Sequence, residues 1–142
     1  MKIEYTVIGT PKPQSRPRFF RNKAGYMGTY SPKTDWFNIV YAETLKQKQI
    51  NLNNQQLNGA LSIKLCFYMP IPKSISKKKR ATLKFVTKKP DIDNLAKAVL
   101  DAINYTNLWE DDSHISHIES SKVYGEEPRC EICIEELKGE QE

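Results

Sequence analysis

The segment from Lys88 to Asp112, KKPDIDNLAKAVLDAINYTNLWEDD, constrains the fold of this chain more than any other. Pro90 pushes the residue before it out of the helical region, so a helix upstream must end there. From the aspartates to about Asn104, apolar residues recur at helical spacing, which predicts a helix with one face packed on a sheet. That apolar set is Leu95, Ala98, Val99, Ala102 and Ile103.

The remaining elements are predicted from alternating apolar and polar residues and from Ser, Pro and Gly residues that mark where elements begin or end. Strands are predicted over residues 2–9, 60–69, about 114–124 and 129–136, the last two joined by a turn at Gly125. Ser31 and Pro32 form a typical helix start, and that helix runs to about residue 50. A short basic helix is predicted over residues 74–86, opened by Ser74 or Ser76. Residues 11–31 show no period and are interpreted as a loop.

The resulting order, β-α-β-α-α-β-β, predicts a single α+β domain with one mixed sheet packed against helices. A length of 142 residues allows one real core and is too short to expect two domains, so residues 1–142 are taken as one unit with an acidic tail from about residue 137. No apolar run approaches the roughly 20 residues of a membrane span, and the N-terminus lacks a signal-peptide core. We therefore expect a cytoplasmic protein with no membrane partner.

Three cysteines argue against a disulfide framework. Cys130 and Cys133 form a C-x-x-C pair, which could be half of a zinc site. The chain has no second pair of this kind, and a structural zinc site needs four ligands. Because Cys130, Ile132 and Ile134 share one face of a predicted strand, we interpret the cysteines as structural.

Positive charge is concentrated in the first 100 residues. They carry 19 Lys or Arg against 5 Asp or Glu, a net charge of +14, whereas residues 101–142 carry 3 against 12, a net of −9. A basic face commonly follows phosphates, although it can also serve only as a solvated surface. The basic residues form two clusters: Lys12, Arg16, Arg18, Arg21 and Lys23, then Lys77, Lys78, Lys79, Arg80, Lys84, Lys88 and Lys89.

Aromatic residues are interleaved with the arginines of the first cluster. This combination suits contact with a nucleic-acid backbone together with base stacking. The same rings could instead anchor a long loop to the core. The aromatic residues concerned are Phe19, Phe20, Tyr26 and Tyr30.

The acidic residues predict a site for a hard divalent cation. Mg²⁺ binds carboxylate oxygens and takes one or two of them plus substrate phosphates. Asp91 follows Pro90 at a helix start, where it could simply cap the helix. Asp91 and Asp93 together exceed what capping needs, and two adjacent carboxylates are costly unless they share a cation. One of Asp111 and Asp112 would complete the set, and spacing does not choose between these two.

Lys97 lies four residues after Asp93 and four before Asp101, so the three share a helix face. They could form an exposed salt-bridge ladder worth a few tenths of a kcal/mol per pair. Alternatively, Lys97 neutralises a phosphate in a transition state, with Asp101 as its positioning partner.

Taken together, PDIDNLAKAVLDAIN, the following LWEDDSHI, the basic run before them and Lys122 in the next strand resemble the RusA family of Holliday junction resolvases. The close match covers about residues 88–124, and the order of elements is compatible with it. The resemblance implies a homodimeric, Mg²⁺-dependent endonuclease, often carried by prophages, with Mn²⁺ as a substitute ion. Its substrate would be a four-way DNA junction, nicked symmetrically during recombination and repair.

By this resemblance Asp91, Asp93 and Asp112 are the catalytic, metal-binding acids, with Asp111 a weaker candidate, and Lys97 is the catalytic lysine. The first loop matches the family poorly, so a DNA-distorting residue there stays unassigned. The residues expected to contact DNA are Arg16, Arg18, Arg21, Lys77, Lys78, Lys79, Arg80, Lys88, Lys89 and Lys122.

Three other functions compete with this interpretation. A phosphatase of the haloacid-dehalogenase type places its Asp-x-Asp after an apolar strand, whereas here Lys-Lys-Pro precedes the pair. A nucleotide-sugar transferase needs a donor domain for which this chain leaves little room. The remaining rival is a non-catalytic protein that binds branched DNA and whose acidic cluster is structural.

Overall fold

The computed structural model describes residues 1–14, 18–30 and 34–139, and it has an α+β fold with a mixed sheet, as expected. The elements, in chain order, are β1 (Lys2–Ile8), β2 (Arg18–Arg21), β3 (Met27–Tyr30), α1 (Asp35–Leu52), β4 (Leu61–Pro70), α2 (Lys77–Arg80), α3 (Ile92–Tyr105), the 3₁₀ turn η1 (Asp112–His114), β5 (Ile115–Gly125) and β6 (Arg129–Glu136).

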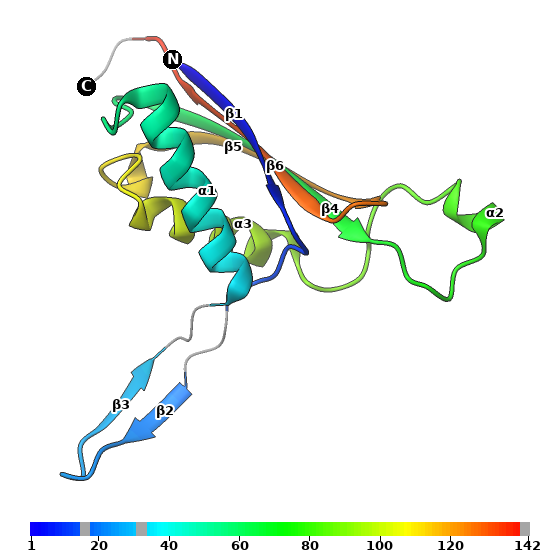
Figure 1. The fold of residues 1–142 in the computed structure, drawn as a ribbon, viewed down its shortest axis with the longest axis horizontal. Helices are drawn as coiled ribbons and strands as arrows, with labels where there is room; N and C mark the ends of the chain where they lie inside the picture. The colour runs from blue at the N-terminus through cyan, green and yellow to red at the C-terminus, as the bar shows by residue number, and fades with distance from the viewer. Residues whose placement is uncertain (15–17, 31–33, 140–142) are drawn as a thin grey trace.

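The main sheet has the strand order β1-β6-β4-β5. In this sheet β4 and β5 run parallel, and the other two pairs are antiparallel. The connection from β4 to β5 contains α3, because parallel neighbours need a long crossover. β5 is therefore an edge strand, and α3 packs beside it (Figure 1).

One face of the sheet forms the core with α1 and α3, which lie on the same side of it (Figure 1). The helices contribute fully buried side chains such as Trp36, Val40, Leu95 and Val99. The alternating strand residues face them: Ile3, Tyr5, Val7, Ile63, Leu65, Phe67, Cys130, Ile132 and Ile134. The predicted alternation of β6 is thus confirmed, and Cys130 and Cys133 point to opposite faces, which is incompatible with a shared zinc ion.

The first predicted loop is wrong, because residues 18–30 form the β2–β3 hairpin. Asn22 explains the turn: its Oδ1 accepts hydrogen bonds of 3.0 Å from the backbone N–H groups of Ala24 and Tyr26. Gly25 takes a φ of 84°, a conformation that glycine adopts without steric cost. The hairpin projects away from the sheet and helices (Figure 1).

Two helix predictions also need correction. The cap of α1 is Thr34, whose Oγ1 accepts from the N–H of Phe37 at 3.0 Å, and the predicted cap at Ser31 and Pro32 lies outside the described residues. The helix predicted over residues 74–86 shrinks to the single turn of α2, capped by Ser76. Its four consecutive cations leave no apolar face to bury, and a turn without packing is marginal.

The residues after α2 extend and pair with the edge strand instead. Phe85 forms an antiparallel bridge with Val123. The N–H of Val86 donates to Lys122 O at 3.1 Å, and the N–H of Tyr124 donates to Lys84 O at 2.9 Å. This pairing carries the chain along β5 to the start of α3. None of the described helices is long and apolar enough to cross a membrane.

Candidate active site

Asp91 occupies the N-cap position of α3 without acting as a cap. Its backbone is extended, with φ −68° and ψ 144°, and its carbonyl accepts the first helical hydrogen bond from Leu95 at 3.1 Å. Its carboxylate makes no capping hydrogen bond. The purely structural interpretation of this aspartate therefore loses its main support, and the exposed carboxylate remains available to a ligand.

Asp91 and Asp93 line one pocket together with residues of the edge strand β5. Ser120 and Lys122 of β5 line this pocket, as do Phe85 and Val86 from the segment before α3. Ser120 and Lys122 pair with Leu65 and Phe67 of β4, so they lie on the core-facing side of the sheet. The Ser120 hydroxyl is buried and has no hydrogen-bond partner among the described residues, which leaves a polar atom free in the lining of this pocket.

Asp93 also belongs to an adjoining pocket that contains Lys97, Asp101 and Asp112. Its remaining lining is largely apolar, from Ile92, Ala96, Leu100 and Ile118, and Ser120 lines both pockets. Within the described parts of the chain, Asp93 and Lys97 form no ion pair with each other. The first of the two predicted salt bridges along this helix face is therefore absent. The pocket brings the Lys97 ammonium and three carboxylates to one place without pairing Lys97 to Asp93.

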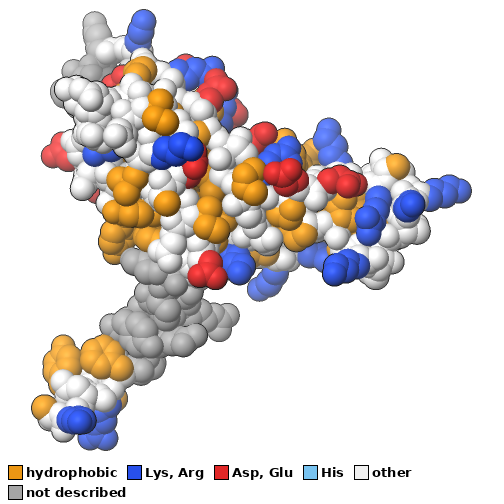
Figure 2. All heavy atoms as spheres, viewed as in Figure 1, with side chains coloured by type: hydrophobic (Ala, Val, Ile, Leu, Met, Phe, Trp, Pro, Cys, Tyr) orange, Lys and Arg blue, Asp and Glu red, His pale blue; other side chains and the backbone are white. Residues whose placement is uncertain are grey.

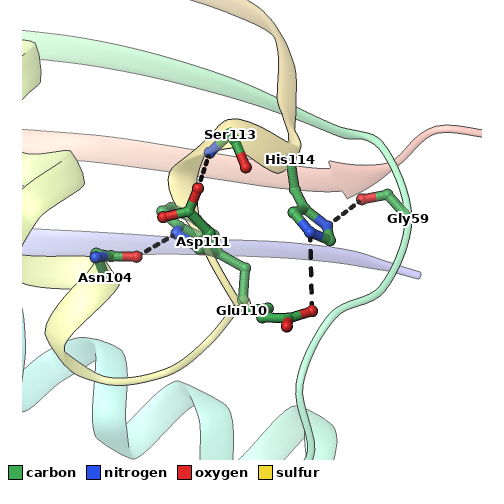
Figure 3. A network of polar contacts seen from close by, with 7 residues as sticks. Gly59, Asn104, Glu110, Asp111, Ser113 and His114 are labelled. Carbon is green, nitrogen blue, oxygen red and sulfur yellow. Dashed lines mark hydrogen bonds and ion pairs between the residues drawn. The ribbon is translucent and has the colours of Figure 1, made fainter.

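Asp111 and Asp112 differ in what they contact. The Asp111 Oδ2 accepts from the backbone N–H of Ser113 at 3.1 Å and caps η1 (Figure 3). Hydrogen bonds from Ser113, first from its side chain and then from its backbone, lower the pKa of the Asp111 carboxyl. Asp112 instead lines the pocket with Asp93 and Lys97. Geometry therefore favours Asp112 for the site and leaves Asp111 a local structural role.

A third pocket extends from Asp91 to Pro13 and Gln14, which precede the hairpin in the chain and are here called the hairpin stem. Pro13 and Gln14 line it together with Lys89, Asp91 and Lys97, as do Pro90 and Asn94. The Gln14 amide donates a hydrogen bond to Asp101 Oδ2, which ties the stem to α3. The start of α3 thus lies next to both the hairpin stem and the end of the basic segment.

The basic residues gather on two projections of the molecule. One is the β2–β3 hairpin, and the other is the segment that carries α2, where lysines and arginines cluster (Figure 2). Lys77, Lys78, Lys79, Lys88 and Lys89 are exposed. Arg80 is half-buried, and its Nε donates to Ile75 O at 3.1 Å.

The first basic cluster is described only in part. Arg21 is exposed in β2, and Arg18 lies in the same strand, although its side chain lies outside the described parts. Arg16 also falls outside the described residues.

The aromatic tip of the hairpin does not anchor it to the core. Tyr26, Met27 and Phe20 are 65%, 63% and 40% exposed. The rings of Phe20 and Tyr26 lie 6.3 Å apart, and the Phe20 ring covers Gly28, where an added Cβ would come within 2.7 Å of it. The anchoring interpretation is therefore wrong for these two rings.

The carboxylate oxygens that a Mg²⁺ site needs are present, but they do not converge on one point. Among the described residues, no three His, Cys, Asp or Glu side chains lie close enough to form a complete metal-ligand set. Mg²⁺ usually keeps several waters and uses one or two carboxylates plus substrate phosphates. The exposed, unengaged carboxylates of Asp91 and Asp93 fit that requirement.

A family model described as endodeoxyribonuclease RusA matches residues 9–135. This chain belongs to the RusA family. It is 37% identical over 142 residues to the uncharacterized protein YqaN of Bacillus subtilis (strain 168), covering 95% of this chain and 96% of YqaN. It is 34% identical over 95 residues to the crossover junction endodeoxyribonuclease rusA of Lactococcus phage r1t, covering 60% of this chain and 72% of the phage protein.

Sequence reasoning missed two residues at the site of this RusA-family chain. Ser120 and Gln14 carry no motif, and both reach the acids only through the tertiary fold. A weak signal existed for Ser120, because Ser120 and Lys122 take positions of β5 where a core-facing strand would otherwise be apolar. No comparable signal marks Gln14.

Proposed function

We propose that this chain is a Mg²⁺-dependent endodeoxyribonuclease that resolves Holliday junctions by paired, symmetric nicks in DNA recombination and repair. The observation that carries the proposal is the set of adjoining pockets at the start of α3. Asp91, Asp93, Asp112 and Lys97 line these pockets, and the Asp91 carboxylate is not used as a helix cap. Family membership and the name of the phage relative support the reaction and the substrate.

Each group in the site has a role in this proposal. Asp91 and Asp93 would hold the cation, and Asp112 would act from the adjoining pocket that it lines with Asp93 and Lys97. A bound Mg²⁺ supplies Lewis-acid activation of the scissile phosphate. Lys97 would neutralise charge that develops on that phosphate.

The two basic projections fit a branched substrate. Lysines on the α2 segment and Arg21 with Lys23 on the hairpin supply cations that replace condensed counterions on DNA. The exposed rings of Phe20 and Tyr26 offer a surface for stacking on a base, which is sequence-tolerant. Because Gln14 and Lys89 line a pocket with Asp91, DNA held by both projections would pass over the acids.

The test separates binding from chemistry. Asp93→Asn should abolish nicking of a labelled synthetic four-way junction in Mg²⁺ or Mn²⁺. Affinity for the junction, measured without a cleaving metal, should stay equal or rise because negative charge near the DNA is removed. Asp35→Asn, at the exposed start of α1, is the matched control and should nick normally.

Two outcomes would contradict the proposal. Cleavage by Asp93→Asn at the wild-type rate removes Asp93 from the site. Tight junction binding by the wild-type protein without cleavage in either metal favours the alternative, a branched-DNA-binding protein whose acids are structural.

A further inference from the structure

Lys122 ties the segment before the acids to the edge strand. Its Nζ donates a hydrogen bond of 2.7 Å to Lys88 O and one of 2.8 Å to Pro90 O. Both acceptors belong to the residues that lead into Asp91. Hydrogen bonds from a charged donor are roughly twice as strong as neutral ones, so this contact is a substantial restraint on an otherwise exposed segment.

The position of Lys122 in β5 explains why its ammonium turns to the backbone. Lys122 pairs with the fully buried Phe67 of β4, so its stem leaves the strand on the core-facing side. An ammonium near apolar surface is costly unless its donors are used. Two of its three donors are used by the carbonyls of Lys88 and Pro90.

The same strand holds this segment at a second place. The backbone of residues 84–86 pairs with residues 122–124, through the N–H of Val86 and the carbonyl of Lys84. The chain is therefore fixed to β5 by backbone pairing and, two to four residues later, by the Lys122 side chain. Asp91 follows directly, and it shares a pocket with Lys122 and Asp93.

We propose that Lys122 is a positioning residue, which fixes the Asp91 carboxylate relative to Asp93 so that both bind one divalent cation. This role differs from the DNA contact expected of Lys122 from the sequence, and it rests on the proposed function. Partners that hold metal ligands in place typically contribute 10–100-fold to metal affinity or activity.

The sign of the effect distinguishes positioning from charge. If Lys122 acted only as a positive charge near the acids, removing it would strengthen cation binding, because a repulsive charge is removed. If Lys122 holds Asp91 in place, removing it weakens cation binding despite that gain. Lys89 provides the matched control, since its exposed side chain lines a pocket with Asp91 and makes no hydrogen bond among the described residues.

The experiment titrates Mn²⁺ into DNA-free protein and counts free ion by electron paramagnetic resonance. Lys122→Met should weaken Mn²⁺ binding by about 10–100-fold, and Lys122→Arg should restore part of it because guanidinium donors can reach carbonyls. Lys89→Met should leave Mn²⁺ affinity equal or higher. Junction binding should show the opposite pattern. Lys89→Met should flatten the slope of log K against log salt by about the amount expected for one fewer neutralised phosphate, whereas Lys122→Met should leave that slope unchanged.

A second measurement needs no metal. Amide hydrogen exchange in a peptide covering residues 86–93 should accelerate in Lys122→Met and not in Lys89→Met, while peptides from α1 stay unchanged. Equal exchange in the wild type and Lys122→Met overturns the inference, as does unchanged or tighter Mn²⁺ binding by Lys122→Met. A wild-type protein that binds no Mn²⁺ and cleaves no junction instead overturns the proposed function together with the metal role of Lys122.

Discussion

At the scale of single residues, two adjacent aspartates differ in what they contact: one stabilises a local turn, and the other lines the candidate site. Asp111 and Asp112 have the same side chain and lie one residue apart, so spacing alone did not choose between them. In the folded chain Asp111 is committed to the N–H of Ser113, whereas Asp112 lines the pocket of Asp93 and Lys97. The choice of Asp112, made by resemblance, thereby gains a geometric argument, although its catalytic role stays a prediction.

This difference predicts opposite outcomes for one chemical change. Asp112→Asn should lower the nicking rate on the order of 10²-fold or more, the size of effect expected when a group that acts on transition-state charge is removed. Asp111→Asn should nick within a few-fold of the wild type, because asparagine keeps an oxygen that can accept from Ser113. Single-turnover cleavage of a labelled junction measures both rates. A larger loss in Asp111→Asn than in Asp112→Asn would reverse the assignment.

At the scale of secondary-structure elements, the basic segment shows that the sequence pattern predicted the start of a helix but not its length. Ser76 marks the start of α2 correctly, and the N–H of Lys79 donates to its Oγ at 3.3 Å. The helix ends after one turn because none of its side chains is buried and because Phe85 pairs with Val123 in an antiparallel bridge. The consequence for function is that Lys77, Lys78 and Lys79 sit on a short projecting turn rather than along a helix face.

Such a projection should act through charge. Replacing Lys77, Lys78 and Lys79 with alanine should flatten the plot of log K against log salt for junction binding by up to about 0.9 for each phosphate that is no longer neutralised. Sequence preference should change little, because interactions with phosphates carry no base information. Lys46→Ala with Lys138→Ala serves as a control for charge removed elsewhere. An unchanged slope in the triple variant would mean that this turn is only a solvated surface.

At the scale of the whole molecule, one chain supplies one set of Asp91, Asp93 and Asp112. Symmetric nicking of a four-way junction needs two such sites on opposite strands, which a C₂ dimer provides. Exposed apolar side chains offer surface for the interface. Ile39 and Ile50 are 42% and 64% exposed on one side of α1, about three turns apart.

Light scattering on DNA-free protein should therefore give about twice the chain mass. Ile39→Glu and Ile50→Glu, tested separately, should each disrupt the dimer if this side of α1 forms the interface, since a buried glutamate on a two-fold surface is costly in both copies. A protein that remains monomeric at micromolar concentration, both alone and on junction DNA, would exclude paired nicking by a dimer. A simple nickase or a binding module would then remain.

The amino-acid sequence by itself determined the features that depend on near neighbours. The apolar stripe of α3, the alternation of β1, β4 and β6, and the Asp91–Asp93–Lys97 spacing are readable because each is set within one or two turns of helix or a few strand residues. The hairpin was missed although its turn is local, because Asn22 and Gly25 are not flanked by clear alternation.

Only the tertiary structure decided which residues surround the acids. Lys122 meets the carbonyls of Lys88 and Pro90, and Gln14 meets Asp101, across long stretches of chain. Those contacts depend on β5 lying parallel to β4 at the sheet edge and on α3 packing beside it. The physical reason is that a residue's local conformational preference determines its own backbone conformation, whereas the residues that its side chain contacts depend on how the whole core packs.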